Sequence, residues 1–533
     1  MKKLTFITAI LLCFALLFVG CTPKTEPAET QEDVTKAPAA SEETQEEQAE
    51  EETEEVIEEV VEMTAMGQFV ADFNFDDPVL DALNDAVGVN IEWELIPNSS
   101  YTERLTIVLT SDDMPDIMYL PDSKFYKDCY EDEYILSLTE YIANAENIQM
   151  YEDPSSLVAA TAADGEIYGL PRNSVPRTDG YAVRLDWLNN LGMTLPADGE
   201  VTLDEFTEIM RAFTEDDPDG NGVDDTYGLT QRATNGELLP PDRIQAAFGA
   251  SSQFEIAPEG SEYEYMNPQY SLTDTSFLES LEYTNMLWES GYIDPNWPAN
   301  DGNAYADRFK AGVAGVTNCF GGWIAGWKSA MVENFPDVEI GYIYGIKDED
   351  GNVKARSILG ANIYGYWTVS KDGAGKEQKV IDFFNYMLSD EGWDTIYYGV
   401  EGYHYTVENG EKVFNDDYLA YNATKSYMAM VRRSNSPNLW LSPHLPQEDR
   451  DAMATVINKC IENVLPSLDL KYTPDSASNP NYIDFQTTYR TTMSKIITGD
   501  SSPDEWVPML EEWYASGGEE YIQEMNEYIK SIQ

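Results

Sequence analysis

Two apolar periodicities alternate along this chain, and their alternation limits the folds open to it. Val89, Ile91, Trp93 and Leu95 alternate with polar residues, which predicts a strand with one buried face. A capping box occupies residues 202–205, and apolar residues with helical spacing follow it at 206, 209, 210 and 213. Further helices are predicted over 380–388, ending by Gly392, and from Pro503 to 517–518. Strands that alternate with helices favour an α/β architecture.

The length and charge narrow the functional classes. At roughly 100–200 residues per domain, 533 residues suggest two or more domains. The chain carries 97 acidic and 32 basic residues, a formal net charge of −65. Because nucleic-acid binding depends on cations that neutralise phosphates, we exclude a nucleic-acid partner. Attraction to an anionic bilayer surface is excluded by the same argument.

Histidine and cysteine are scarce. The chain has two histidines, His404 and His444, and five cysteines. They lack the short spacing of a zinc site, and nothing near the histidines resembles a nucleophile elbow. The three cysteines after Cys21 are too few for a disulfide framework, so we expect them to be unbridged.

The N-terminus has the pattern of an export signal. Lys2 and Lys3 precede an apolar run over residues 4–19, and Gly20-Cys21 follows. The alternative, a membrane-spanning anchor, would need about 20 apolar residues. The segment resembles a bacterial lipoprotein signal, which predicts a signal peptide over 1–20, lipidation of Cys21 and attachment to the outer face of the cell membrane through the lipid alone.

Residues 21–57 are rich in Glu, Thr, Ala, Pro and Gln and poor in apolar residues. Such a segment cannot bury enough surface to offset the entropy of ordering it. We therefore expect a disordered acidic tether between the anchored cysteine and the folded part.

An oxygen-rich loop follows the helix predicted after residue 202. A glycine-rich segment carries side-chain oxygens at alternate or near-alternate positions, on Asp217, Asp219, Asn221 and Asp225. The Val223 carbonyl supplies a further oxygen. Calcium prefers six to eight such oxygens around a tightly turning backbone. Loop position twelve is glycine, so the loop is not an EF-hand. We expect a structural calcium ion; the alternative is an acidic turn that caps the helix.

The loop lies within a longer series of short motifs. In chain order over nearly all of residues 60–530, these are 111–117 (SDDMPDI), 168–172 (YGLPR), 181–192 (YAVRLDWLNNLG), 225–229 (DTYGL), 289–295 (ESGYIDP), 309–315 (FKAGVAG), 399–405 (GVEGYHY) and 495–499 (KIITG). The series resembles family 1 extracellular solute-binding proteins, the lipoprotein receptors of carbohydrate ABC importers, and in particular their alginate-oligosaccharide-binding members.

This resemblance implies a periplasmic-binding-protein-like fold of two α/β lobes that are discontinuous in sequence and joined by crossing hinge strands. The first crossing falls at 168–172 and the return at 363–369. We therefore expect an N-terminal lobe of 58–171 and 362–425, and a C-terminal lobe of 172–361 and 426–533, with the ligand held between them.

The resemblance also implies ligand-binding residues. Trp323 stands where relatives place a cleft-wall tryptophan, although a core tryptophan is the alternative. Asp122 follows a strand at a ligand-contacting loop, or is only a turn residue, and Arg172 follows the crossover strand, or forms a surface ion pair. Tyr403 and Tyr405 lie in a glycine-rich loop similar to the family's.

The resemblance implies that the chain is a monomeric, non-catalytic receptor that delivers an oligosaccharide to ABC permease subunits. A surface glycoside hydrolase is the main alternative, but its pair of carboxylates cannot be recognised among 97 acids. A receptor for another solute, such as a peptide, also stays open.

Overall fold

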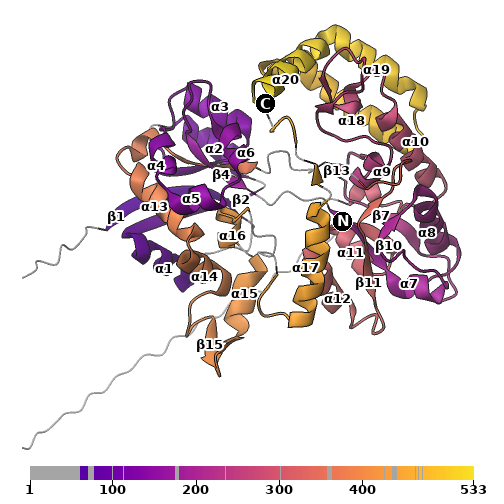
Figure 1. The fold of residues 1–533 in the computed structure, drawn as a ribbon, viewed down its shortest axis with the longest axis horizontal. Helices are drawn as coiled ribbons and strands as arrows, with labels where there is room; N and C mark the ends of the chain where they lie inside the picture. Colours follow the sequence, from indigo (N-terminus) through magenta and orange to yellow (C-terminus); the bar gives the residue numbers. More distant parts are fainter. Residues whose placement is uncertain are drawn as a thin grey trace, which may run out of the picture. The chain divides into compact units, whose positions relative to one another are not determined.

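The computed structural model describes residues 60–69, 77–98, 100–111, 113–173, 179–233, 236–300, 302–353, 355–356, 363–424, 426–434, 441–462, 464–465, 467–470 and 472–532. The predicted signal peptide, Cys21 and the acidic tether lie outside these residues. The described part folds around two large apolar cores, and the elements packed on each are called the first lobe and the second lobe below (Figure 1).

The first lobe is built on a five-stranded sheet in the order β2-β1-β3-β14-β4. β1 pairs in parallel with β2 and β3, whereas β14 is antiparallel to both β3 and β4. β14 reaches this sheet from far along the chain and is almost entirely buried, as expected of a central strand. The strands are β1 (Val61–Phe69), β2 (Val89–Pro97), β3 (Ile117–Leu120), β4 (Gly169–Asn173) and β14 (Ile363–Val369).

Helices from two stretches of sequence cover this sheet. The first stretch supplies α1 (Pro78–Val87), α2 (Tyr101–Leu109), α3 (Ser123–Glu131), α4 (Thr139–Ala143), α5 (Glu146–Tyr151) and α6 (Pro154–Ala160). The second supplies α13 (Glu377–Leu388), α14 (Asp390–Tyr398), the hairpin β15 (Tyr405–Glu408) and β16 (Glu411–Phe414), α15 (Asp416–Thr424) and α16 (Ser426–Met430).

The second lobe contains a four-stranded sheet in the order β11-β5-β10-β7. β10 runs parallel to β7 and antiparallel to β5. The strands are β5 (Gly180–Arg184), β7 (Tyr227–Thr230), β10 (Ala314–Cys319) and β11 (Ile340–Ile343), with the short pairs β6 (Glu200–Val201) with β12 (Gly345–Ile346), β8 (Glu255–Ile256) with β9 (Tyr265–Met266), and β13 (Ala355–Arg356) with β17 (Val464–Leu465).

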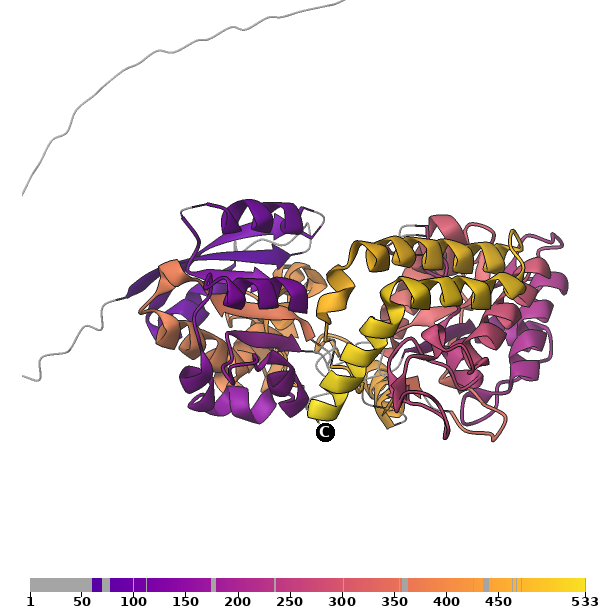
Figure 2. The same ribbon diagram turned by 90° about the horizontal axis from the view of Figure 1, so that it is seen from above.

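The helices of the second lobe also come from two stretches. They are α7 (Leu185–Asn190), α8 (Leu203–Glu215), α9 (Asp242–Ala247), α10 (Ser276–Glu289), α11 (Ala304–Lys310) and α12 (Ile324–Met331), followed by α17 (Gln447–Glu462), α18 (Pro480–Thr498), α19 (Trp506–Trp513) and α20 (Glu519–Ser531). Short 3-10 turns precede several of them, including η3 (Gly321–Trp323), η6 (Asp475–Ser478) and η7 (Pro503–Glu505). Figure 2 shows the last three helices, drawn in gold and yellow, along one side of this lobe.

The first lobe extends beyond the boundaries predicted for it at residues 171 and 425. Asn173 in β4 pairs with Ile363 in β14, so this part of the chain still belongs to the first sheet. The first core continues to Val431, and the indole Nε1 of Trp367 donates a hydrogen bond to the Met430 carbonyl at 2.8 Å. Tertiary packing thus assigns α16 to the first lobe.

One predicted helix end needs correction. Gly392 does not end α13; it lies inside α14, where a Cβ would come within 1.9 Å of the Tyr386 carbonyl oxygen. Ser389 separates the two helices and caps α14 by accepting from the Gly392 amide. At the other predicted end, Gly517 has a φ of 118° and lies at a kink between α19 and α20, so the predicted break at 517–518 is confirmed.

The predicted capping box is confirmed, and the described cysteines are unbridged. Thr202 and Glu205 form both hydrogen bonds of the capping box at the start of α8. The three described cysteines, Cys129, Cys319 and Cys460, are free thiols in buried positions. No helix in the part of the chain that the structure describes has the length and apolar character to cross a membrane.

Candidate functional site

The second lobe presents polar and aromatic groups at one edge of its sheet. The parallel strands β7 and β10 end at Thr230 and Cys319, and the antiparallel β5 begins at Gly180. Residues just beyond these points therefore meet at the same edge. In open α/β sheets, ligands bind outside the carboxyl ends of the parallel strands.

A cavity of about 590 Å³ lies at this edge. That volume is within the range of small-molecule sites, roughly 300–1,000 Å³. Aromatic rings and hydrogen-bonding side chains line it together, which suits a ligand with both apolar faces and polar groups. The lining includes Tyr270, Tyr305, Trp323, Tyr489, Asp179, Gln231, Arg232, Glu237, Asn318, Gln486 and Arg490.

Trp323 is the most exposed aromatic side chain of this lining, with 43% of its surface open. The turn η3 holds it, and its ring packs against Phe320 at 5.8 Å and Trp327 at 6.0 Å between centroids. A Cβ at Gly321 would lie 2.3 Å from the Val456 side chain, so glycine permits α17 to pack against this turn. The exposure rules out a fully buried core position for Trp323.

The charged groups that line the cavity differ in whether they already have a partner. Arg490 pairs with Glu237 at 3.4 Å, while Arg232 is exposed and forms no ion pair with the described residues. Beside the lining residue Asp242, the Arg243 Nε donates to the backbone carbonyl of Asp179 at 2.8 Å. Burial raises the pKa of Asp242 to about 6. The cavity thus offers a guanidinium that is available to a ligand.

Arg172 lies at the corresponding edge of the first sheet, near the end of β4. Its guanidinium donates to the Tyr119 hydroxyl at 3.2 Å and lies over the rings of Tyr119 and Tyr364, at 5.4 and 5.6 Å from their centroids. Its Nε is buried without a hydrogen-bond partner among the described residues. Arg172 forms no ion pair with the residues that the structure describes, and the rings fix the guanidinium at the carboxyl edge of the sheet.

Asp122 is the N-cap of α3. Its carboxylate accepts from the Phe125 amide at 2.8 Å, which gives it a structural role at the start of the helix. It lies directly after β3 and so shares the carboxyl edge with Arg172. A contribution of Asp122 to ligand binding stays a prediction.

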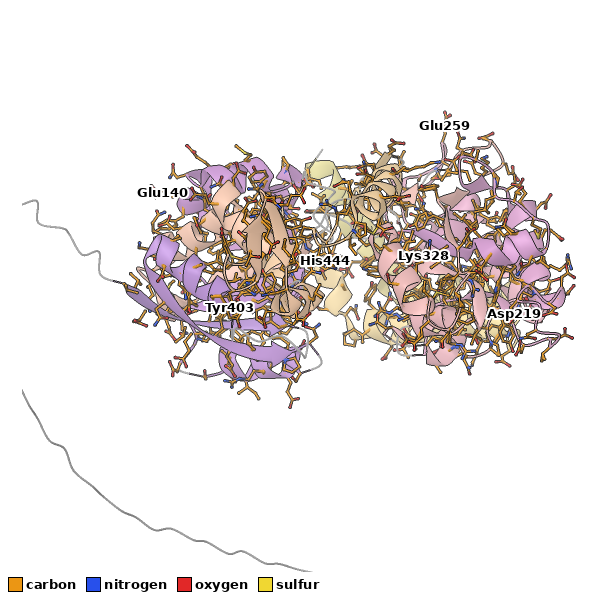
Figure 3. The ribbon with its side chains drawn as sticks, turned by 90° about the horizontal axis from the view of Figure 1, so that it is seen from below. Glu140, Asp219, Glu259, Lys328, Tyr403 and His444 are labelled. Carbon is orange, nitrogen blue, oxygen red and sulfur yellow. The ribbon has the colours of Figure 1, made fainter. Side chains whose placement is uncertain are left out.

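Tyr403 and Tyr405 do not line the Trp323 cavity. Tyr405 is buried in β15 beside Phe414, and its hydroxyl accepts from the Lys412 ammonium at 3.0 Å. Tyr403 is 44% exposed and packs edge-on against His404. Figure 3 shows Tyr403 in the first lobe. The buried position of Tyr405 gives it a packing role.

The predicted calcium loop follows α8 in the second lobe (Figure 3). The Asn221 side-chain amide donates to Asp219 at 2.9 Å and to Asp225 at 3.2 Å, and the Gly222 amide donates to Asp217 at 3.0 Å. Burial and the neighbouring carboxylates of Asp217 and Asp225 raise the pKa of Asp219.

The side-chain oxygens of this loop show whether it fits a cation. Asp217 Oδ1 is buried without a hydrogen-bond partner among the described residues, and the Asp217 backbone has a positive φ of 47°. In the part of the chain that the structure describes, no three His, Cys, Asp or Glu side chains lie close enough together to hold a metal on their own. A cation here would therefore need Asn221 and backbone oxygens as well, which calcium accepts.

The sequence reasoning missed Arg232, Asn318 and Arg490. Arg232 comes two residues after β7, and Asn318 is the second-to-last residue of β10, so the carboxyl-edge rule could have indicated both. Arg490 lies within α18, far along the chain, and gave no sequence signal of its own. Only the packing of α18 against the second lobe brings Arg490 to the cavity.

The chain folds into two α/β lobes, and each lobe is discontinuous in sequence. Each lobe also has charged and aromatic groups at the carboxyl edge of its sheet. These features define the class of two-lobed binding proteins. The chain belongs to the bacterial extracellular solute-binding protein family, whose model matches residues 70–392. This confirms the resemblance seen in the sequence. It also indicates a binding function rather than a catalytic one for the family.

Individual relatives cover most of the chain. It is 26% identical to Lipoprotein LipO of Bacillus subtilis (strain 168), over 85% of this chain and 89% of that protein. It is 23% identical to the polygalacturonan/rhamnogalacturonan-binding protein YtcQ of the same strain, over 84% and 86%. The crystal structure of the alginate-binding protein AlgQ2 without calcium ion matches with a TM-score of 0.66 at 18% identity, over 89% of this chain and 98% of that one. The two-lobed fold is thereby confirmed.

Proposed function

We propose that this protein is a surface receptor that binds an oligosaccharide and delivers it to an ABC importer. The observation that carries the proposal is the exposed Trp323 ring beside Arg232 and Asn318 in one cavity at the carboxyl edge of the second sheet. The polysaccharide ligands in the names of YtcQ and AlgQ2 support it.

The chemistry of the cavity suits a sugar. The apolar C–H face of a sugar ring packs on an aromatic ring, which contributes about 1 kcal/mol. Hydrogen bonds from charged groups such as Arg232 to sugar hydroxyls contribute roughly 1.5–3 kcal/mol each. Several such contacts reach micromolar affinity once the costs of association are subtracted.

A thermal-shift screen against oligosaccharides tests this function, because a ligand that binds only the native state raises the melting temperature. The panel should contain neutral and uronic-acid oligosaccharides and short peptides, followed by calorimetry on the hits. We expect at least one oligosaccharide to bind and the peptides not to bind. Binding of peptides alone would refute the carbohydrate assignment.

We propose that the protein binds its ligand without altering it. The test is to incubate the protein with each oligosaccharide that binds and to separate the products by chromatography. The oligosaccharide should be recovered intact. Time-dependent release of shorter sugars would instead make the protein a glycoside hydrolase.

We infer further that the mature protein is held at the membrane by lipid on Cys21 and works with separate permease subunits. The lipoprotein name of LipO supports the anchor. Replacing Cys21 by Ser should release the protein into the medium, as measured by fractionation and by labelling with a fatty-acid analogue. Retention of the Cys21→Ser protein in the membrane fraction would contradict this anchor.

We propose that the loop at 217–225 holds a structural calcium ion. Asp217, Asp219, Asn221 and Asp225 would supply side-chain oxygens, and Val223 its carbonyl. The unpartnered Asp217 oxygen and the raised pKa of Asp219 support the proposal, since both are costs that a cation would relieve.

A further inference from the structure

A second cavity, of about 620 Å³, shares no lining residue with the Trp323 cavity. It is bounded on one side by α3, the end of α6 and β14, and on the other by Leu470, residues 472–475, Ser478 and the last turn of α20. Figure 2 shows α20, in yellow, running toward the helices of the first lobe. Its volume is again within the range of small-molecule sites.

Aromatic rings form much of this cavity. Tyr126 and Tyr366 stack with their centroids 4.1 Å apart, and Tyr472 and Tyr528 stack at 3.9 Å. Tyr130 packs edge-on against Tyr126 at 5.5 Å. Tyr126 and Tyr366 are buried and form the floor, whereas the other three rings are only partly buried. The cavity therefore offers flat apolar surfaces that are already fixed in place.

The tyrosine hydroxyls give the cavity its polar character. Tyr126 accepts from the Tyr168 amide and donates to the Ala160 carbonyl, both at 2.8 Å, so its hydroxyl is fully used. The hydroxyls of Tyr130, Tyr366, Tyr472 and Tyr528 have no hydrogen-bond partner among the residues that the structure describes. Burial raises the pKa of Tyr528 to about 12, so this hydroxyl stays protonated and can donate as well as accept.

The charged side chains at this cavity already have partners. Lys124 pairs with Asp128 at 2.6 Å. Lys127 pairs with Glu131 at 3.9 Å and also with Asp475. A charged ligand would have to compete with these ion pairs, whereas a neutral one would leave them intact. Fixed aromatic faces and free hydroxyls suit a ring that carries hydroxyl groups and apolar C–H faces.

We propose that this tyrosine-lined cavity is a second binding site, which takes a neutral saccharide of one or two rings. The site is separate from the Trp323 cavity and goes beyond the proposed function. Its ligand would contact both the α3 side and the α20 side of the cavity.

The test uses the full chain with Trp323→Ala, which weakens the first cavity, and compares it with the same chain carrying Tyr130→Phe and Tyr528→Phe. These changes remove two hydroxyls but keep both rings, so the fold should persist, as a melting curve checks. The probes are maltose, cellobiose and galactobiose, with digalacturonate as the charged counterpart of galactobiose. Binding is measured by saturation-transfer NMR and titration.

We expect a neutral disaccharide to bind the Trp323→Ala chain at millimolar concentrations, and the two phenylalanine changes to lower that affinity about tenfold, as for the loss of two hydrogen bonds. Digalacturonate should not bind there. The proposal fails if no neutral disaccharide binds the Trp323→Ala chain, or if the phenylalanine changes leave binding unaltered. It also fails if those changes weaken binding at the Trp323 cavity of the otherwise wild-type chain, because the two cavities would then be one site.

Discussion

Replacing Trp323 by alanine is the sharpest test of the candidate ligand site. The change removes an indole that is 43% exposed at the mouth of the cavity. A sugar ring that stacks on Trp323 would lose its apolar platform, while the hydrogen bonds from Arg232 and Asn318 would stay available. We therefore expect weaker binding rather than complete loss.

The expected loss of binding free energy follows from the exposed surface of the Trp323 ring. Aromatic side chains bury about 150–250 Å² when fully covered, so 43% exposure leaves roughly 60–110 Å² for a ligand. A sugar covers one face of the ring, or about half of that area. At about 25 cal/mol per Å², the contact contributes about 1 kcal/mol, which corresponds to an approximately fivefold higher Kd.

Calorimetry with the oligosaccharide from the screen measures this Kd. Tyr403→Ala is the matched control, because Tyr403 has nearly the same exposed fraction, 44%, but does not line the cavity. We expect Tyr403→Ala to bind as wild type does, with little change in the melting temperature of either variant. If Tyr403→Ala weakens binding and Trp323→Ala does not, the ligand site lies at the β15–β16 hairpin and the cavity assignment is wrong.

Three further predictions follow from the packing and charges. Glu152 is buried and its pKa is raised well above its ordinary value by burial, so folding favours its protonated form and the free energy of unfolding should fall as pH rises above about 4.3. Glu152→Gln should make this slope shallower in urea titrations between about pH 4 and pH 7, while the contribution of Asp242 remains. Calcium should raise the melting temperature of wild type and of Asp348→Asn, whose carboxylate only accepts turn amides, but not of Asp219→Asn. Gly392→Ala should destabilise the protein by more than about 2 kcal/mol through its clash in α14, whereas Gly326→Ala, with open space in α12, should stabilise it by about 0.5–1 kcal/mol.

Each of these has a clear contrary result. An equal pH slope in wild type and Glu152→Gln would mean that Glu152 is ionised in the folded state. The same calcium-dependent shift in wild type and Asp219→Asn would remove Asp219 from the ligand set. Equal stability of the two glycine variants would contradict the packing of α14 against Tyr386.

The sequence by itself determined the local elements and the family. Periodicity fixed β2 and α8, because side-chain direction repeats every two residues in a strand and every 3.6 in a helix. The capping box at Thr202 is a contact within four residues and needs no tertiary partner. The ordered series of motifs was enough to indicate two discontinuous lobes. Such features depend on neighbours along the chain.

The tertiary structure decided which residues form the sites, because that depends on contacts between distant parts of the chain. A glycine such as Gly392 commonly marks the end of a helix. Here it lies inside α14, where close packing against Tyr386 leaves no room for a side chain. α16 joins the first lobe through the contact of Trp367 with Met430. Sequence could not separate a buried tryptophan from an exposed one, since exposure of Trp323 depends on where η3 places it beside β7 and α18.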